Sequence, residues 1–237
     1  NVAVMANVDD SATGGSSIVS AEYSLDSGST WAPMAAQDGA FDEVTEDVLA
    51  SFTAPGTAGI YELCVRGTDA AGNVGEPQCI TFVVYDPAGG FVTGGGWIDS
   101  PAGAYMPNPA APFTPTGKAT FGFVSKYQKG ASVPSGNTQF QFKAAGLNFH
   151  STSYEWLVVT GSNYARYKGE GTINGAVAPN GAPYKLMLWA GDGTGPNGED
   201  TFRLKIWYEE DGSEVVVYDN GMDQAIGGGE IKVHKAK

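Results

Sequence analysis

The sequence predicts an all-β chain of two modules, and three observations support this. Apolar and polar residues alternate with period two through most segments, as strands with one buried face require. The 34 Gly and 13 Pro supply many turns without a collagen-like period. The apolar run 83–85 stops at Asp86-Pro87, where a proline without an N–H ends strand pairing. We therefore expect one domain at residues 1–86 and a larger one at residues 87–237.

The charge is unevenly distributed along the 237 residues. Residues 1–86 hold 13 acidic residues and one basic residue, Arg66 (net −12), and residues 87–237 hold 13 acidic and 12 basic residues (net −1), which sum to the total of −13. Such an acidic module repels phosphate backbones and anionic lipid. No apolar stretch reaches the length of about 18 residues that a membrane span needs. We expect neither nucleic-acid binding nor membrane insertion.

The first module has six segments with strand character, which predict a β-sandwich. In the segment 19–25, for example, Val19, Ala21, Tyr23 and Leu25 share one face. The six segments are residues 2–8, 19–25, 31–34, 48–53, 60–68 and 78–85.

The two cysteines, Cys64 and Cys79, lie on either side of the turn sequence 69–73. A hairpin centred between Ala71 and Gly72 brings them opposite each other, so we expect a cross-strand disulfide. A disulfide requires an oxidising compartment, and we therefore expect a secreted or cell-surface protein.

An acidic cluster precedes the strand at residue 48. Its five carboxylates lie within ten residues and offer enough oxygens for Ca²⁺, but their spacing matches no EF-hand loop. The sequence favours a solvated loop. The five residues are Asp38, Asp42, Glu43, Glu46 and Asp47.

Residues 21–28 (AEYSLDSG), Trp31 and residues 61–73 (YELCVRGTDAAGN) carry a resemblance to bacterial immunoglobulin-like modules. The resemblance implies an immunoglobulin-like sandwich that acts as a spacer or adhesion unit rather than as an enzyme. Such a sandwich usually has one further N-terminal strand. We expect that strand to have been lost from this fragment or to be supplied by a neighbour.

The second module alternates strongly and predicts about ten antiparallel strands, in a β-sandwich or jelly-roll-like domain. Glycine triplets at residues 94–96 and 227–229 frame it, and we expect the first and last strands to be neighbours. Residues 100–117, with five prolines, are expected to form a surface loop.

Six stretches of this module resemble the C-terminal β domain that follows choice-of-anchor modules in secreted bacterial proteins. That resemblance implies no enzymatic activity. The stretches are residues 94–105 (GGGWIDSPAGAY), 117–123 (GKATFGF), 149–157 (FHSTSYEWL), 171–175 (GTING), 200–207 (DTFRLKIW) and 217–220 (VYDN).

Catalytic motifs are absent from the sequence, which holds no Gly-x-Ser-x-Gly, His-Glu-x-x-His or phosphate-binding loop. The run 193–198 fits a dinucleotide fingerprint in form, but a strand rather than a helix follows it, so we expect a hairpin loop. His150 and His234 are the only histidines. We expect no enzyme, and a hydrolase built on a carboxylate pair is the least favoured class.

Two places could form a site. Trp189 and Trp207 fall on the more polar face of their strands, where flat rings could form a platform for sugars, unless loops or a second sheet cover them. Asp192, Glu199 and Asp200 could hold a structural Ca²⁺, although Asp192-Gly193 is also an ordinary turn sequence. No other cofactor is indicated.

The sequence thus favours a non-catalytic interaction or spacer fragment of a larger secreted or cell-surface bacterial protein. The alternative is a carbohydrate-binding accessory module that uses the two tryptophans. The expected partner is an extracellular polysaccharide or protein.

Overall fold

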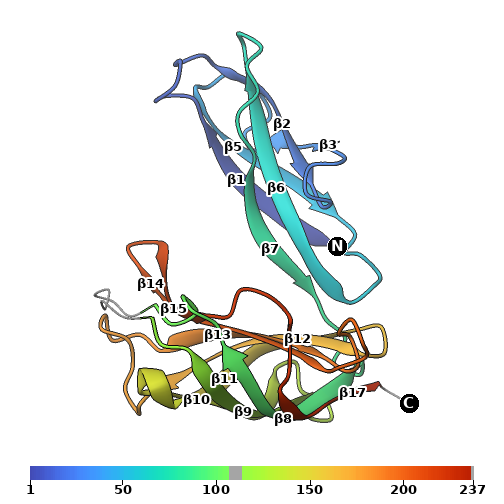
Figure 1. The fold of residues 1–237 in the computed structure, drawn as a ribbon. Coiled ribbons are helices and arrows are strands. Elements are labelled where there is room, and N and C mark those ends of the chain that lie inside the picture. Colours follow the sequence, from blue (N-terminus) through green and yellow to red (C-terminus); the bar gives the residue numbers. More distant parts are fainter. Residues whose placement is uncertain (107–113, 236–237) are drawn as a thin grey trace. The chain divides into compact units, whose positions relative to one another are not determined.

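The computed structural model describes residues 1–106 and 114–235, and these residues confirm the all-β class (Figure 1). They form two compact units, Asn1–Val84 and Tyr85–Lys237. The one helical segment among them is a single 3₁₀ turn, η1 (Lys143–Ala145), so no helix of the described chain could cross a membrane. Part of the expected loop at 100–117, residues 107–113, lies outside the described residues.

Unit 1 contains two antiparallel sheets of three and four strands. One has the strand order β1-β5-β4 and the other the order β3-β2-β6-β7. The expected segment 31–34 contains the two-residue strand β3, and the equally short β4 directly follows it. The strands are β1 (Val2–Asp9), β2 (Ile18–Ser24), β3 (Ala32–Pro33), β4 (Ala35–Ala36), β5 (Thr45–Phe52), β6 (Gly59–Asp69) and β7 (Gln78–Val84).

The core of unit 1 is small. Its fully buried apolar residues come from both sheets, and the Phe52 ring packs against Tyr23 and Phe82 at centroid distances of 5.6 and 5.5 Å. Six buried side chains form the core: Val4, Ala21, Met34, Val48, Phe52 and Leu63.

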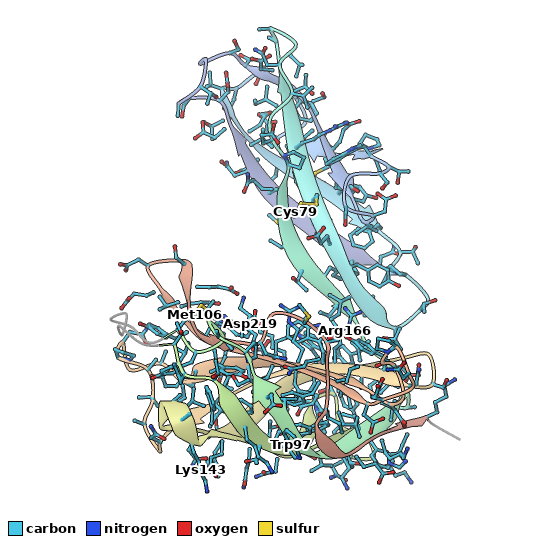
Figure 2. The ribbon with its side chains drawn as sticks, in the orientation of Figure 1. Cys79, Trp97, Met106, Lys143, Arg166 and Asp219 are labelled. Atoms are coloured by element: carbon cyan, nitrogen blue, oxygen red, sulfur yellow. A yellow bond between two sulfur atoms is a disulfide. The ribbon has the colours of Figure 1, made fainter. Side chains whose placement is uncertain are left out.

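The expected disulfide is confirmed. Cys64 of β6 lies directly opposite Cys79 of β7 in the strand register, and their sulfur atoms are bonded (Figure 2). The turn at residues 69–73 that brings them together is held by Asp69, which accepts hydrogen bonds from the Asn73 backbone N–H at 2.7 Å and from its side-chain amide at 2.8 Å.

Unit 2 has the expected ten or so antiparallel strands, and they are hydrogen-bonded into one continuous ten-stranded sheet that curls over as the layers of a sandwich do. The strand order is β15-β14-β13-β12-β11-β10-β9-β8-β17, with β16 beside β14. The strands are β8 (Gly90–Ser100), β9 (Gly117–Tyr127), β10 (Pro134–Phe142), β11 (Leu147–Thr160), β12 (Tyr164–Ile173), β13 (Tyr184–Gly191), β14 (Thr201–Glu210), β15 (Ser213–Asp219), β16 (Gln224–Ala225) and β17 (Gly228–Lys235).

The sheet of unit 2 curls over a single core. Phe121 of β9 and Phe202 of β14 are five strands apart in the sheet, yet their rings stack at a centroid distance of 4.0 Å. The fully buried Tyr167 hydroxyl finds a partner in Thr138 Oγ1 at 2.8 Å, as a polar group in an apolar interior requires. Two parts of one curled sheet therefore enclose the core, as two separate sheets do in a sandwich.

The first and last strands of unit 2 pair, as expected: β8 and β17 run antiparallel from Trp97↔Gly228 to Gly90↔Lys235. Glycine is required where they approach most closely. Gly229 has φ +111°, and a Cβ there would lie 2.1 Å from the carbonyl oxygen of Gly95.

Removing the disulfide should destabilise unit 1 selectively. The bridge closes a loop of 15 residues, and the chain-entropy model then gives a loss of about 3 kcal/mol for Cys64→Ala/Cys79→Ala. Differential scanning calorimetry should show one of two transitions moving to lower temperature, and dithiothreitol should move the same transition in the wild type. A shift of both transitions would contradict the independence of the two units.

Candidate functional site

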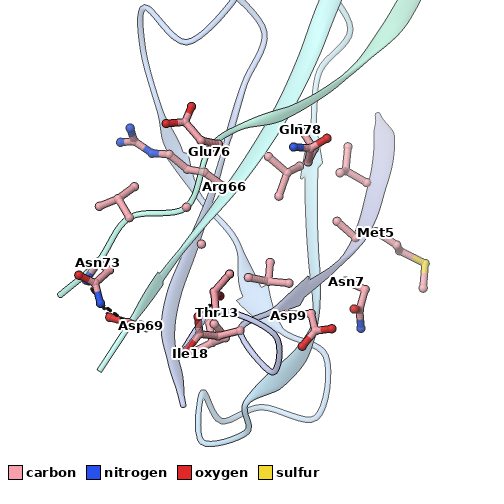
Figure 3. A pocket seen from close by; sticks show the side chains of 18 of the residues that line it. Met5, Asn7, Asp9, Thr13, Ile18, Arg66, Asp69, Asn73, Glu76 and Gln78 are labelled. Carbon is pink, nitrogen blue, oxygen red and sulfur yellow. Dashed lines mark hydrogen bonds between the residues drawn. The ribbon is translucent and has the colours of Figure 1, made fainter. Parts of the chain in front are cut away.

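A groove of about 900 Å³ runs along unit 1 between β1 and the β6–β7 hairpin. In the close-up, Met5, Asn7 and Asp9 of β1 line one part of it, and Arg66, Glu76 and Gln78 another (Figure 3). The groove lies within unit 1 and is lined by residues of both of its sheets.

At the groove the hydrophobic core of unit 1 is exposed to solvent, as the position of Ile80 shows. Ile80 lies opposite Leu63 in the β6–β7 register, so both side chains point to the same face of the sheet. Leu63 is 7% exposed and belongs to the core, whereas Ile80 is 65% exposed. A large apolar side chain at a core-facing position is normally covered, and here nothing in the described part of unit 1 covers it.

The groove is bordered by two sheet edges. Within the described residues, β1 pairs with β5 alone and β7 pairs with β6 alone. The outer edge of each strand therefore offers unpaired backbone N–H and C=O groups, which can bond an added strand. Apolar surface between two such edges has the features that a β-strand needs in order to bind.

The groove is also acidic. Its lining includes four carboxylates, those of Asp9, Asp10, Asp69 and Glu76, against the single guanidinium of Arg66. Hydrogen bonds from Ser11 and Thr45 lower the pKa of Asp9, and those from Asn73 lower the pKa of Asp69, so both stay charged in mild acid. Arg66 is occupied by Glu22, at 2.8 and 3.1 Å, and leaves the groove negative.

The predicted aromatic platform lies on the outer face of β13 and β14. Trp207 is only 5% exposed, with its Nε1 buried and without a hydrogen-bond partner in the described chain, and Lys205 lies over its ring at 5.0 Å. Trp189 is half-buried beneath the guanidinium of Arg203 at 4.4 Å. The two rings therefore do not form an open platform, and Trp189 alone retains an accessible edge.

Three of the cations on this face have anionic partners, whereas the Nε of Arg166 is buried without a hydrogen-bond partner among the described residues. Arg203 bonds Asp219 at 3.2 and 3.3 Å, Lys185 bonds Glu209 at 2.5 Å, and Lys205 bonds Glu214. Figure 2 labels Arg166 and Asp219 on this side of unit 2. In each of these three ion pairs the two charges compensate each other.

The three carboxylates predicted to hold calcium each accept hydrogen bonds within the chain. Asp200 accepts from the Gly193 and Ile231 N–H groups at 2.8 and 2.6 Å, and Asp192 accepts from the Val233 N–H at 3.2 Å. The Asn197 amide bonds Glu199 at 2.8 Å and lowers its pKa. These bonds tie β17 to the β13–β14 hairpin, which the run 193–198 forms as expected. They leave no group of three converging carboxylates there.

Sequence reasoning did not find the residues that line the groove. Ile80 alternates like any core residue of a strand, so its exposure cannot be read from its neighbours in the chain. The only signal was the expectation of a missing first strand, which carried no residue numbers.

Asp200→Ala should destabilise unit 2 without affecting calcium binding. Two backbone N–H groups lose their acceptor, and we expect the free energy of unfolding to fall by about 1–3 kcal/mol. Urea unfolding with and without calcium tests this, with the exposed Glu210→Ala as the control. A calcium-dependent gain of stability that Asp200→Ala abolishes would restore the predicted metal site.

Comparison with protein-family models, curated proteins and solved structures finds no match for this chain.

Proposed function

We propose that the chain is a non-catalytic extracellular interaction module in which unit 1 binds an extended β-strand of another polypeptide. The observation that supports this most is the exposure of Ile80 at a core-facing position between two unpaired sheet edges. Strand addition satisfies both features at once, because it pairs the edges and covers the apolar surface.

The acidic lining of the groove indicates which side chains the bound strand should carry. Apolar side chains at alternate positions would face the core, and basic side chains between them would meet the accessible carboxylates of Asp9, Asp10 and Glu76. A second copy of this chain is the weaker candidate, since residues 1–86 carry a net charge of −12 and would repel themselves. The free edge of β1 is eight residues long, so the bound segment is of similar length.

An extracellular setting follows from the disulfide, because Cys64–Cys79 requires an oxidising compartment to persist. The likeness of residues 61–73 to bacterial immunoglobulin-like modules agrees with a secreted or cell-surface bacterial protein. In this proposal unit 2 is the spacer that presents unit 1.

Carbohydrate binding is the alternative function, and it depends on Trp189. A half-buried indole beside Arg203 and Asp219 offers an apolar edge with polar neighbours, which suits a sugar ring. It has less support than the groove, because Trp207 is buried and Arg203 covers the Trp189 face.

A synthetic peptide of alternating valine and lysine, (Val-Lys)₄, should bind unit 1 and raise its melting temperature. Isothermal titration calorimetry gives the affinity, and hydrogen exchange should show slower exchange in β1 and β7. Strand β15 of unit 2 should not change, because residues 104–106 already bond its outer edge. Ile80→Lys should weaken binding at least about tenfold, while Val19→Lys, at an exposed apolar position outside the groove, should not.

Two control peptides separate strand recognition from general attraction to an acidic protein. The block peptide Val₄Lys₄ has the same charge and composition but no alternation, and (Val-Glu)₄ has the alternation with the opposite charge. Equal binding of (Val-Lys)₄ and Val₄Lys₄, or equal protection of β15, would overturn the proposal. Self-association that Ile80→Lys abolishes, seen by analytical ultracentrifugation, would replace the proposed partner with a second copy.

The alternative makes a separate prediction, for which Trp189→Ala is the probe. If the groove is the functional site, pull-down on insoluble cellulose, chitin and peptidoglycan should retain neither the wild type nor Trp189→Ala. Retention of the wild type that falls at least about tenfold in Trp189→Ala would favour the carbohydrate function.

A further inference from the structure

Three of the five acidic residues before β5 converge in space. Asp38 and Asp42 lie in the loop between β4 and β5, and Glu46 lies in β5 itself. One carboxylate oxygen from each lies within 4.8 Å of the others. No other group of three such ligands lies this close together in residues 1–106 and 114–235.

Glu46 is the unusual member, because it is a buried acid. Along β5, buried positions alternate with exposed ones, and Glu46 falls on the same face as the core residue Val48. It is 2% exposed, and its Oε2 has no hydrogen-bond partner among the described residues. A buried carboxylate oxygen without a partner is costly, which indicates a missing ligand.

Neighbouring carboxylates increase the free-energy cost of burying a charged Glu46. Burial raises the pKa of Glu46, and the carboxylates of Asp38, Glu43, Asp42 and Asp47 raise it further. No basic side chain offsets them, because Arg66 is the only one in residues 1–86 and it pairs with Glu22. The cluster lacks a counter-charge.

We propose that Asp38, Asp42 and Glu46 bind a calcium ion in unit 1. Three carboxylates provide up to six oxygens, and water completes the six to eight that calcium takes. Oxygen ligands without histidine or cysteine favour a hard cation over zinc. The exposed loop suits the flexible geometry of calcium better than the strict octahedron of magnesium.

Two acidic residues lie outside the converging trio. The Asp47 carboxylate accepts from the Asn7 amide at 2.8 Å, and the backbone carbonyl of Glu43 accepts from the Ile18 N–H at 2.7 Å. The Gln37 N–H bonds the Asp47 carbonyl at 2.7 Å and closes the loop. The loop is thus held at both ends, with its remaining acids directed together.

Calcium titration of the full chain tests the site. We expect a Kd of about 0.1–1 mM, the range of extracellular modules. At 10 mM calcium the melting temperature of unit 1, the dithiothreitol-sensitive transition, should rise by about 5 °C or more relative to protein in EDTA. Magnesium should have a smaller effect. Heteronuclear NMR should show the shifted amides within residues 37–47.

Glu46→Gln is the decisive variant, since it keeps the shape of the side chain and removes its charge. It should weaken calcium binding at least about tenfold and, without calcium, melt above the wild type, because a buried unpaired charge is gone. Asp42→Asn should also weaken binding. Glu43→Gln removes a charge from the same loop outside the trio, so it is the control that should retain calcium binding.

The proposal is overturned if 10 mM calcium leaves the melting temperature unchanged, if Glu43→Gln and Glu46→Gln respond alike, or if the NMR shifts fall at residues 192–200 instead. The site is separate from the strand-binding groove, so calcium can bind even if no peptide does. The two proposals therefore fail independently.

Discussion

Every strand at the edge of a sheet carries unpaired backbone groups, and this constraint shapes both units. In unit 2 one sheet of ten strands curls until β9 and β14 face each other, and a single core forms beneath it. Close pairing of β8 with β17, which requires Gly229, joins the two ends of the unit's chain. In unit 1 the edges of β1 and β7 border an uncovered core. Unit 2 keeps two edge strands as well, β15 and β17, but its sheet covers its own core, whereas the core of unit 1 stays open between its two edges.

The acidity of unit 1 is more than a means of solvation. With Arg66 as its single basic residue, the unit cannot neutralise its own carboxylates. Some of them act as acceptors in turns, as Asp69 does with Asn73. Others line the groove or meet in the loop before β5. In our proposals, basic side chains of a bound strand neutralise the groove carboxylates, and a metal ion neutralises the loop carboxylates.

Much of the fold could be predicted because period-two alternation and turn residues act locally. The disulfide and the hairpin at 193–198 follow from short-range patterns, whereas the pairing of β8 with β17 was expected from glycine triplets at opposite ends of the second module. The curl of unit 2 could not be predicted, because alternation fixes which side of a strand is buried but not whether one sheet or two bury it. The tryptophans were placed on the correct face, but the burial of Trp207 depends on long side chains such as Lys205.

The acidic residues show the same limit more sharply. Asp192, Glu199 and Asp200 looked like ligands because they lie near one another in sequence, yet each bonds a different backbone or amide group. Five acids before β5 looked like a solvated loop, yet strand pairing turns Glu46 inward. In both groups of acids, the role of a carboxylate depends on which hydrogen-bond donors reach it, and this depends on how the chain folds.

The bridge between β6 and β7 also bears on how unit 1 would behave under tension. If the unit unfolded while pulled at both ends, the segment between Cys64 and Cys79, which are 15 positions apart, would stay looped and add no length. The stretched chain would then be shorter by about 50 Å, at 3.3–3.6 Å per residue. The disulfide would therefore act as a limit on the extension of unit 1.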